Sequence, residues 1–171
     1  LSAQNFTTST DSYNVAIGYS AMTSNTTGID NVAVGGLSLD ANTTGNYNTA
    51  IGKSSLGTNT TGANNTAVGR NALFANTTAS SGTAVGYEAL KSNTTGANNV
   101  AVGNATLDAN TTGDNNVGIG TNALSANTTA EANTALGTNA LLVNTTGAYN
   151  TALGMSSLDA NTTASYNTAV G

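Results

Sequence analysis

Residues 65–78 read Asn-Thr-Ala-Val-Gly-Arg-Asn-Ala-Leu-Phe-Ala-Asn-Thr-Thr, and variants of this stretch follow one another along nearly the whole chain. The opening motif, Asn-(Thr/Val)-Ala-(Val/Ile/Leu)-Gly, begins again every 17 residues, without insertion or deletion, at residues 14, 31, 48, 65, 82, 99, 116, 133, 150 and 167. Two copies depart from it, at Gly82 and Gly118. A short, constant period is typical of a solenoid, in which each repeat forms one rung stacked on the previous one.

The repeat defines the domain organisation, and we number its positions 1 to 17 from the asparagine. Residues 14–171 form an array of ten rungs with the last one incomplete, and residues 1–13 form a degenerate repeat. Because the chain stops five residues into a rung, we expect it to be a piece of a longer fibre.

The apolar residues within a rung predict its strands. Position 4 is always aliphatic, and position 9 is Leu except for Met22. Short Thr/Val-Ala-Val segments favour strands, whereas no stretch has the spacing of an amphipathic helix. We therefore predict an all-β fold, a parallel β-solenoid or β-roll with two short strands per rung, near positions 1–4 and 7–11. Turns at the glycine of position 5 and at Asn-Thr-Thr-Gly would join them.

The glycine at position 5 is a predicted structural residue because it never varies, which suggests a positive φ or no room for a Cβ atom. By contrast, position 15 is Gly in six rungs and Ala at Ala79, Ala130 and Ala164, so we expect no left-handed residue there. The complete rungs carry the position 5 glycines Gly18, Gly35, Gly52, Gly69, Gly86, Gly103, Gly120, Gly137 and Gly154.

The asparagine at position 12 is the second predicted structural residue. Asparagine side chains close turns and, on successive rungs, bond to one another in a ladder, a role that we also expect for position 1. Asn-Thr-Thr is also a glycosylation sequon, so a row of sugars is an alternative, although we favour turn chemistry. The asparagines concerned are Asn25, Asn42, Asn59, Asn76, Asn93, Asn110, Asn127, Asn144 and Asn161.

The alanine at position 3 predicts contact on both faces of the first strand. Side chains alternate along a strand, so positions 2 and 4 face away from position 3. We expect the aliphatic residues of positions 4 and 9 to be buried. Position 3 is alanine in every repeat except for glycine at Gly118, which indicates that something packs closely against it. We therefore predict a homo-oligomer with one face of this strand on a shared axis.

Composition excludes several classes of function. The chain has no His or Cys, which excludes common catalytic triads and zinc sites, and we expect no enzyme activity, metal or cofactor. A net charge of −5 argues against nucleic-acid binding. No apolar run reaches the roughly 18 residues of a membrane span, so we expect no membrane insertion.

Charged and aromatic residues are few, and we interpret most of them as ordinary surface groups. The acids are scattered, and Asp40, Asp108 and Asp159 share position 10 in rungs too far apart to pair. Lys53 and Arg70 share position 6 in adjacent rungs, so a small basic spot is an alternative there, although we favour ordinary surface charges. The tyrosines occur mostly at positions 6 and 17, and we expect isolated surface packing from them.

The motif, as at residues 65–78 and 82–96, resembles the repeats of phage-type tail-fibre proteins. Its Asn-(Thr/Val)-Ala-Val-Gly core is also similar to the head repeats of trimeric autotransporter adhesins, over residues 14–171. The resemblance implies a parallel β-roll, left-handed in the adhesin heads, made by three chains on a virion or cell surface. Adhesin heads have a shorter rung, and the Asn-Thr-Thr-Gly turn is an extension of it.

Several functions fit this repeat. The leading prediction is the structural shaft of an extracellular or virion fibre that holds a binding tip away from the surface. One alternative is direct adhesion to a surface glycan or matrix protein through the repetitive surface, where avidity adds to weak contacts. Another is a self-assembling extracellular filament, because uncapped solenoid ends stack. Ice binding by the threonine rows of positions 13 and 14 is a further alternative.

Overall fold

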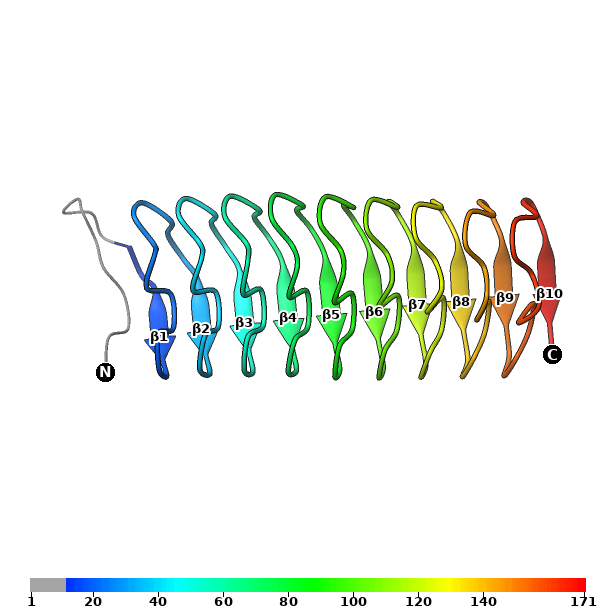
Figure 1. Ribbon diagram of the computed structural model, residues 1–171, viewed down its shortest axis with the longest axis horizontal. Coiled ribbons are helices and arrows are strands. Elements are labelled where there is room, and N and C mark those ends of the chain that lie inside the picture. The colour runs from blue at the N-terminus through cyan, green and yellow to red at the C-terminus, as the bar shows by residue number, and fades with distance from the viewer. Residues whose placement is uncertain (1–11) are drawn as a thin grey trace.

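The computed structural model describes residues 12–171 and contains ten parallel strands in one sheet, in chain order (Figure 1). Each strand pairs with the next at an offset of one repeat, as in Val15 with Val32. The predicted all-β parallel solenoid with 17-residue rungs is confirmed, whereas the degenerate repeat at 1–13 lies outside the described residues except for its last two. The strands are β1 (Val15–Ile17), β2 (Val32–Val34), β3 (Thr49–Ile51), β4 (Thr66–Val68), β5 (Thr83–Val85), β6 (Val100–Val102), β7 (Val117–Ile119), β8 (Thr134–Leu136), β9 (Thr151–Leu153) and β10 (Thr168–Val170).

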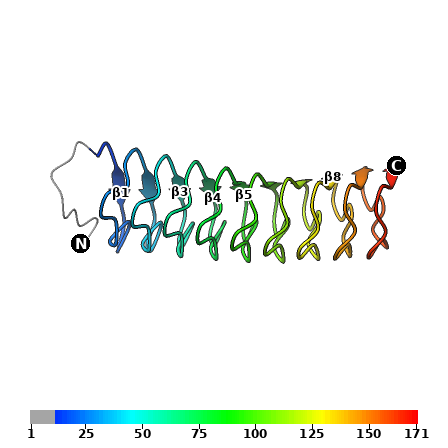
Figure 2. The same cartoon turned by 90° about the horizontal axis from the view of Figure 1, so that it is seen from above.

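The molecule is an elongated stack with its sheet along one side. Figure 1 shows the strands in a row from the N-terminal to the C-terminal end, and Figure 2 shows that connecting segments form the opposite side. Ten rungs at about 4.8 Å each give a stack about 50 Å long. The strands and the segments between them therefore present the same arrangement at every level of the stack.

Each rung contains one strand, so the prediction of a second strand at positions 7–11 is wrong. The residues at positions 7 and 9 have left-handed backbone angles, with φ of 58° at Leu37 and 51° at Leu39. A strand requires negative φ at every residue, and alternating left-handed residues coil the segment instead. The left-handed residue at position 9 directs the Leu or Met side chain inward, where it is fully buried or nearly so from Met22 to Leu141.

The core is narrow and consists mainly of small residues. It contains the position 9 leucines, the position 3 alanines from Ala33 to Ala152, and alanine at many of the position 8 sites. The position 4 residues do not join them: Ile51 is 40% exposed and Leu136 is 43% exposed. The expectation that position 4 is buried is therefore wrong for the single chain, because the strand turns its alanine, rather than its two larger side chains, toward the interior.

Backbone hydrogen bonds connect every rung to both neighbours. In the second rung, the Val32 amide donates to the Asn48 carbonyl of the following rung at 2.8 Å, and the Gly35 amide donates to the Ile17 carbonyl of the preceding rung at 2.8 Å. The same two bonds recur along the stack. Since most rung contacts are of this nearest-neighbour kind, stability accumulates rung by rung, as in other solenoids.

Candidate functional site

The position 12 asparagines form the predicted ladder inside the solenoid. The side-chain amide of Asn42 donates to Oδ1 of Asn25 at 2.8 Å and to the Gly45 carbonyl at 3.0 Å. Equivalent bonds join each later pair up to Asn161 and Asn144. Each bond satisfies a buried polar group, which would cost free energy if it were left unpaired. The ladder therefore fixes both the turn within a rung and the spacing between rungs.

The position 1 asparagines form a second line of hydrogen bonds. The side-chain amide of Asn48 donates to the Gly62 carbonyl of its own rung at 2.9 Å, while the Asn48 backbone amide donates to Oδ1 of Asn31 at 2.9 Å. The Gly62 carbonyl also accepts from Asn59, at position 12, at 3.0 Å. Both asparagines of a rung thus meet at the carbonyl of position 15 and close the coil.

The folded rungs are incompatible with glycosylation of the position 12 asparagines. The side chains from Asn25 to Asn144 have 0–1% exposure, and each amide nitrogen already donates within the ladder. A sugar on that nitrogen would displace the neighbouring rung. From Asn25 to Asn144 a glycan row therefore does not fit the folded rungs, in which the Asn-Thr-Thr sequence serves turn and ladder chemistry.

The position 5 glycines have both of the properties that their invariance suggested. Their φ angles lie between 121° at Gly171 and 138° at Gly137. From Gly18 to Gly137, a Cβ atom would lie within 2.7 Å of the next rung's position 5 glycine. Position 15 behaves as predicted, because its glycines and alanines are absent from the residues with positive φ. Position 5, unlike position 15, thus combines a positive φ with a close approach of the next rung.

The one glycine at position 3, Gly118, is explained by its neighbour. Thr106 replaces the usual Ala or Ser of position 8 in the preceding rung, and its Cγ2 would lie 2.7 Å from a Cβ atom on Gly118. The Thr106 hydroxyl donates to the Gly120 carbonyl at 2.6 Å. The threonine methyl therefore occupies the space that the alanine methyl fills elsewhere. Nothing in the sequence of either rung alone indicates this exchange.

The outer face of the sheet, formed by positions 2 and 4 of β1 to β10, is the principal unpartnered surface. Its residues are Val, Thr, Ile and Leu throughout, and it carries no charged residue. Several of its aliphatic side chains are more than a third exposed, including Ile51, Val85, Ile119, Leu136 and Leu153. Exposed apolar surface of this continuity is typical of an interaction site.

The charged residues differ in their exposure and contacts, although we expected ordinary solvated surface groups. Asp40 and Asp108 are partly buried rather than solvated, and burial raises the pKa of both carboxyl groups. Oδ1 of Asp108 is buried without a hydrogen-bond partner in residues 12–171. Lys91 forms an ion pair with Glu88 at 3.2 Å, and the Arg70 guanidinium lies over the Tyr87 ring at 5.7 Å.

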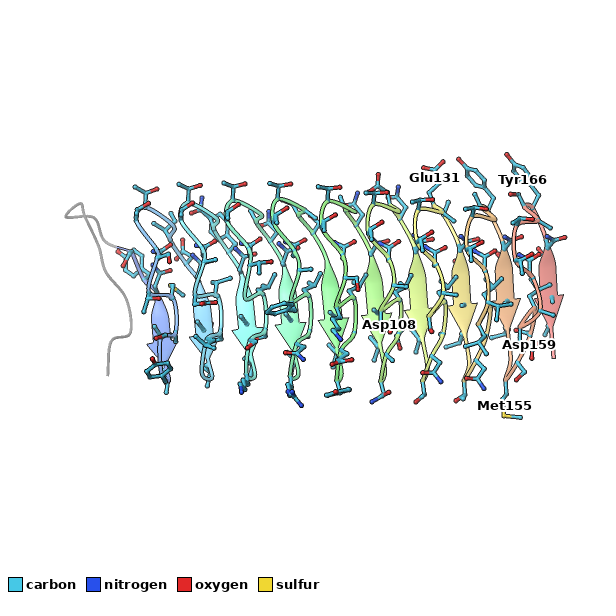
Figure 3. The ribbon with its side chains drawn as sticks, in the orientation of Figure 1. Asp108, Glu131, Met155, Asp159 and Tyr166 are labelled. Atoms are coloured by element: carbon cyan, nitrogen blue, oxygen red, sulfur yellow. The ribbon has the colours of Figure 1, made fainter. Side chains whose placement is uncertain are left out.

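Two tyrosines are in contact, so the expectation of isolated aromatic residues is wrong. Tyr149 and Tyr166 share position 17 in adjacent rungs, and their rings stack with centroids 5.1 Å apart. The Tyr149 hydroxyl donates to Glu131 at 2.9 Å, and this hydrogen bond raises the tyrosine pKa. Glu131 and Tyr166 lie along one edge of the solenoid (Figure 3). This contact could have been predicted from the sequence, because the two tyrosines occupy the same repeat position in adjacent rungs.

The surface of residues 12–171 offers little chemistry beyond these features. This part of the chain contains no group of three or more potential metal-ligating side chains, and none of its segments is a helix long and apolar enough to cross a membrane. Comparison of the chain with protein-family models, curated proteins and solved structures found no match.

Proposed function

We propose that this chain forms the shaft of an extracellular or virion fibre and holds a binding tip away from the surface. The observation that carries the proposal is the uninterrupted outer sheet face on a stack in which each rung is bonded to its neighbours. A surface of this kind associates along its whole length with an equivalent surface. A shaft needs that continuity, whereas a catalyst needs a local site.

Association of copies accounts for the exposed aliphatic side chains. Removing apolar surface from water contributes about 25 cal/mol for each Å² buried, and position 4 supplies an aliphatic side chain in every rung. The interior of a single rung holds mainly one Leu or Met and several alanines, so the second large aliphatic side chain contributes to stability only when another chain covers it. Three copies are the number that the resemblance to adhesin heads implies.

The direct test is the solution mass of the purified chain, measured by light scattering at micromolar concentration, together with negative-stain images of the same sample. The proposal predicts a discrete small oligomer of short, uniform rods, because lateral contact between equal faces closes on itself. A monomer at that concentration would contradict the self-association. Open-ended polymers of variable length would instead support the alternative of a filament subunit.

A further inference from the structure

Three consecutive rungs, at residues 48–98, differ from the rest of the array in their charge. They contain all three basic residues of the chain, Lys53, Arg70 and Lys91, and a single acid, Glu88, so their net charge is 3 − 1 = +2. The other residues carry seven acids, from 8 − 1, and no base. A chain with a net charge of −5 thus has one zone of opposite sign.

The same rungs also carry two exposed aromatic rings. Tyr87 is 44% exposed, and Phe74, the only phenylalanine among the described residues, is 38% exposed. The Phe74 ring lies against Gly57 of the preceding rung, where a Cβ atom would come within 3.1 Å of it. Tyr87 occupies position 6, where the next three rungs have the non-aromatic residues Asn104, Thr121 and Thr138. We call Lys53, Arg70, Phe74, Tyr87 and Lys91 the basic–aromatic belt.

The belt has free charge available for a ligand. Glu88 neutralises Lys91 through their ion pair, and it also accepts a hydrogen bond from Asn71 at 3.2 Å. Within residues 12–171, neither Lys53 nor Arg70 forms an ion pair. Tyr87 holds the Arg70 guanidinium by a cation–π contact and so orients it at the solenoid edge. The two position 6 cations lie one rung apart, at about 4.8 Å along the axis.

We propose that the basic–aromatic belt binds an acidic polysaccharide built of uronate sugars. Guanidinium and ammonium groups pair with carboxylates, and exposed aromatic rings offer apolar faces to the C–H surface of a pyranose ring. Lys53, Arg70 and Tyr87 share repeat position 6 with Met155. Figure 3 shows Met155 projecting from one edge of the solenoid. An open edge suits an extended polymer, for which many weak contacts add through avidity.

This binding is separate from lateral association of the shaft. The belt uses positions 6 and 10, whereas the outer sheet face uses positions 2 and 4 and carries no charge. Binding of polysaccharide therefore does not depend on whether copies associate. It would give the shaft an adhesive zone of its own, of a known chemical class, in addition to any tip.

The test is binding of the full chain to immobilised alginate, a polyuronate, with neutral dextran as the reference surface. We expect binding to alginate alone, weakened by added salt because exposed charges are screened. The double variant Lys53→Gln/Arg70→Gln should bind about tenfold more weakly, which is the scale of two exposed charge contacts. The variant Thr121→Glu/Thr138→Glu changes the net charge equally, at the same repeat position outside the belt, and should retain most of the affinity.

Three results would overturn the proposal, and the first two concern alginate binding itself. One is equal binding of the wild type to alginate and dextran, and the other is unchanged alginate binding by Lys53→Gln/Arg70→Gln. Phe74→Ser, with the serine that occurs at Ser125 in the same repeat position, tests the carbohydrate assignment. Equal binding of alginate and single-stranded DNA, unaffected by Phe74→Ser, would mean that the belt recognises charge alone and would reject it. Circular dichroism should show that each variant keeps the wild-type fold.

Discussion

At the scale of the residue, the ten near-identical rungs serve as controls for one another. When one rung has an unusual side chain, other rungs show the same backbone position with a different residue or in a different environment. The comparison shows what the unusual side chain changes. Gly118 has its counterpart in Thr106, and Asp108 has an equivalent in the exposed Asp159. These departures indicate where a single side chain changes the free energy of the stack.

Asp108 is predicted to make stability depend on pH. Burial raises its pKa in the folded protein, so the folded state binds a proton more readily than the unfolded chain. The ionised carboxylate therefore destabilises the fold at neutral pH, and this penalty disappears as the pH falls through the raised pKa toward about 4. Asp108→Asn should have a higher melting temperature than the wild type at pH 7, and the difference should shrink at pH 4.

Thermal denaturation at several pH values checks this expectation. Asp159→Asn is the matched control, because Asp159 occupies the same repeat position but is exposed. It should change the melting temperature little. A melting temperature of Asp108→Asn that equals that of the wild type at pH 7 would show that burial of this carboxylate has no energetic consequence.

Thr106 and Gly118 are predicted to be energetically coupled. Gly118→Ala places a Cβ atom 2.7 Å from the Thr106 methyl, and such overpacking of a core costs about 1–3 kcal/mol. With Thr106→Ala in the same chain, the two adjacent rungs have the usual alanines at positions 8 and 3, and most of that loss should be recovered. Denaturant unfolding of the wild type, both single variants and the double variant gives the coupling energy. Additive effects of the two substitutions would contradict this packing account.

At the scale of the element, a rung combines one short strand with a coiled return segment. The strand is only three residues long, and hydrogen bonds from two asparagine positions supplement its backbone pairing. The left-handed residues at positions 7 and 9 cost conformational energy, which burial of the position 9 side chain offsets. The asparagine ladders therefore supply hydrogen bonds between rungs that longer strands would supply in other sheets.

The fifth rung lacks one connection of the ladder, and restoring it should stabilise the protein. Gly82 stands where the other rungs have asparagine, so the Gly96 carbonyl accepts a side-chain hydrogen bond only from Asn93, at 2.9 Å. The φ of Gly82 is not positive, and a Cβ atom would meet Oδ1 of Asn65 at 3.1 Å, which a small side-chain shift relieves. Gly82→Asn should raise the free energy of unfolding by about 1 kcal/mol, from a new hydrogen bond and a stiffer unfolded chain.

Chemical denaturation measures this gain, and the reverse change one rung earlier is its control. Asn65→Gly removes donors to Asn48 and to the Ala79 carbonyl, as well as the acceptor of the Gly82 amide, and should destabilise the protein by at least as much. A lower stability of Gly82→Asn would show that the glycine is required for another reason.

At the scale of the whole molecule, the outer sheet face and the basic–aromatic belt divide the surface between two proposed roles. The face repeats along the full stack, which suits an extended contact between copies. The belt occurs once, in three rungs, which suits recognition. We therefore assign the repeating outer sheet face a structural role and the single basic–aromatic belt a binding role.

The proposed lateral association predicts that charge on the outer sheet face separates the copies. Val85→Glu/Ile119→Glu places two carboxylates on the face, where burial against another chain would leave them unpaired at a cost of several kcal/mol. Light scattering should show a shift toward the monomer. Thr95→Glu/Thr129→Glu makes the same charge change at exposed position 14 and should leave the oligomer intact. Equal masses for both variants would exclude this face from the interface.

The sequence by itself determined the rung length, the parallel stacking, the need for glycine at position 5 and the asparagine ladder. Each of these follows from local chemistry repeated at a constant period. Only the tertiary structure decided which face of the strand turns inward and that positions 7–11 coil rather than extend. Alternation shows that Ala67 opposes Val68 but not which is buried. The narrow interior, already filled by Leu73 and two lines of asparagine, admits the alanine and leaves the valine outside.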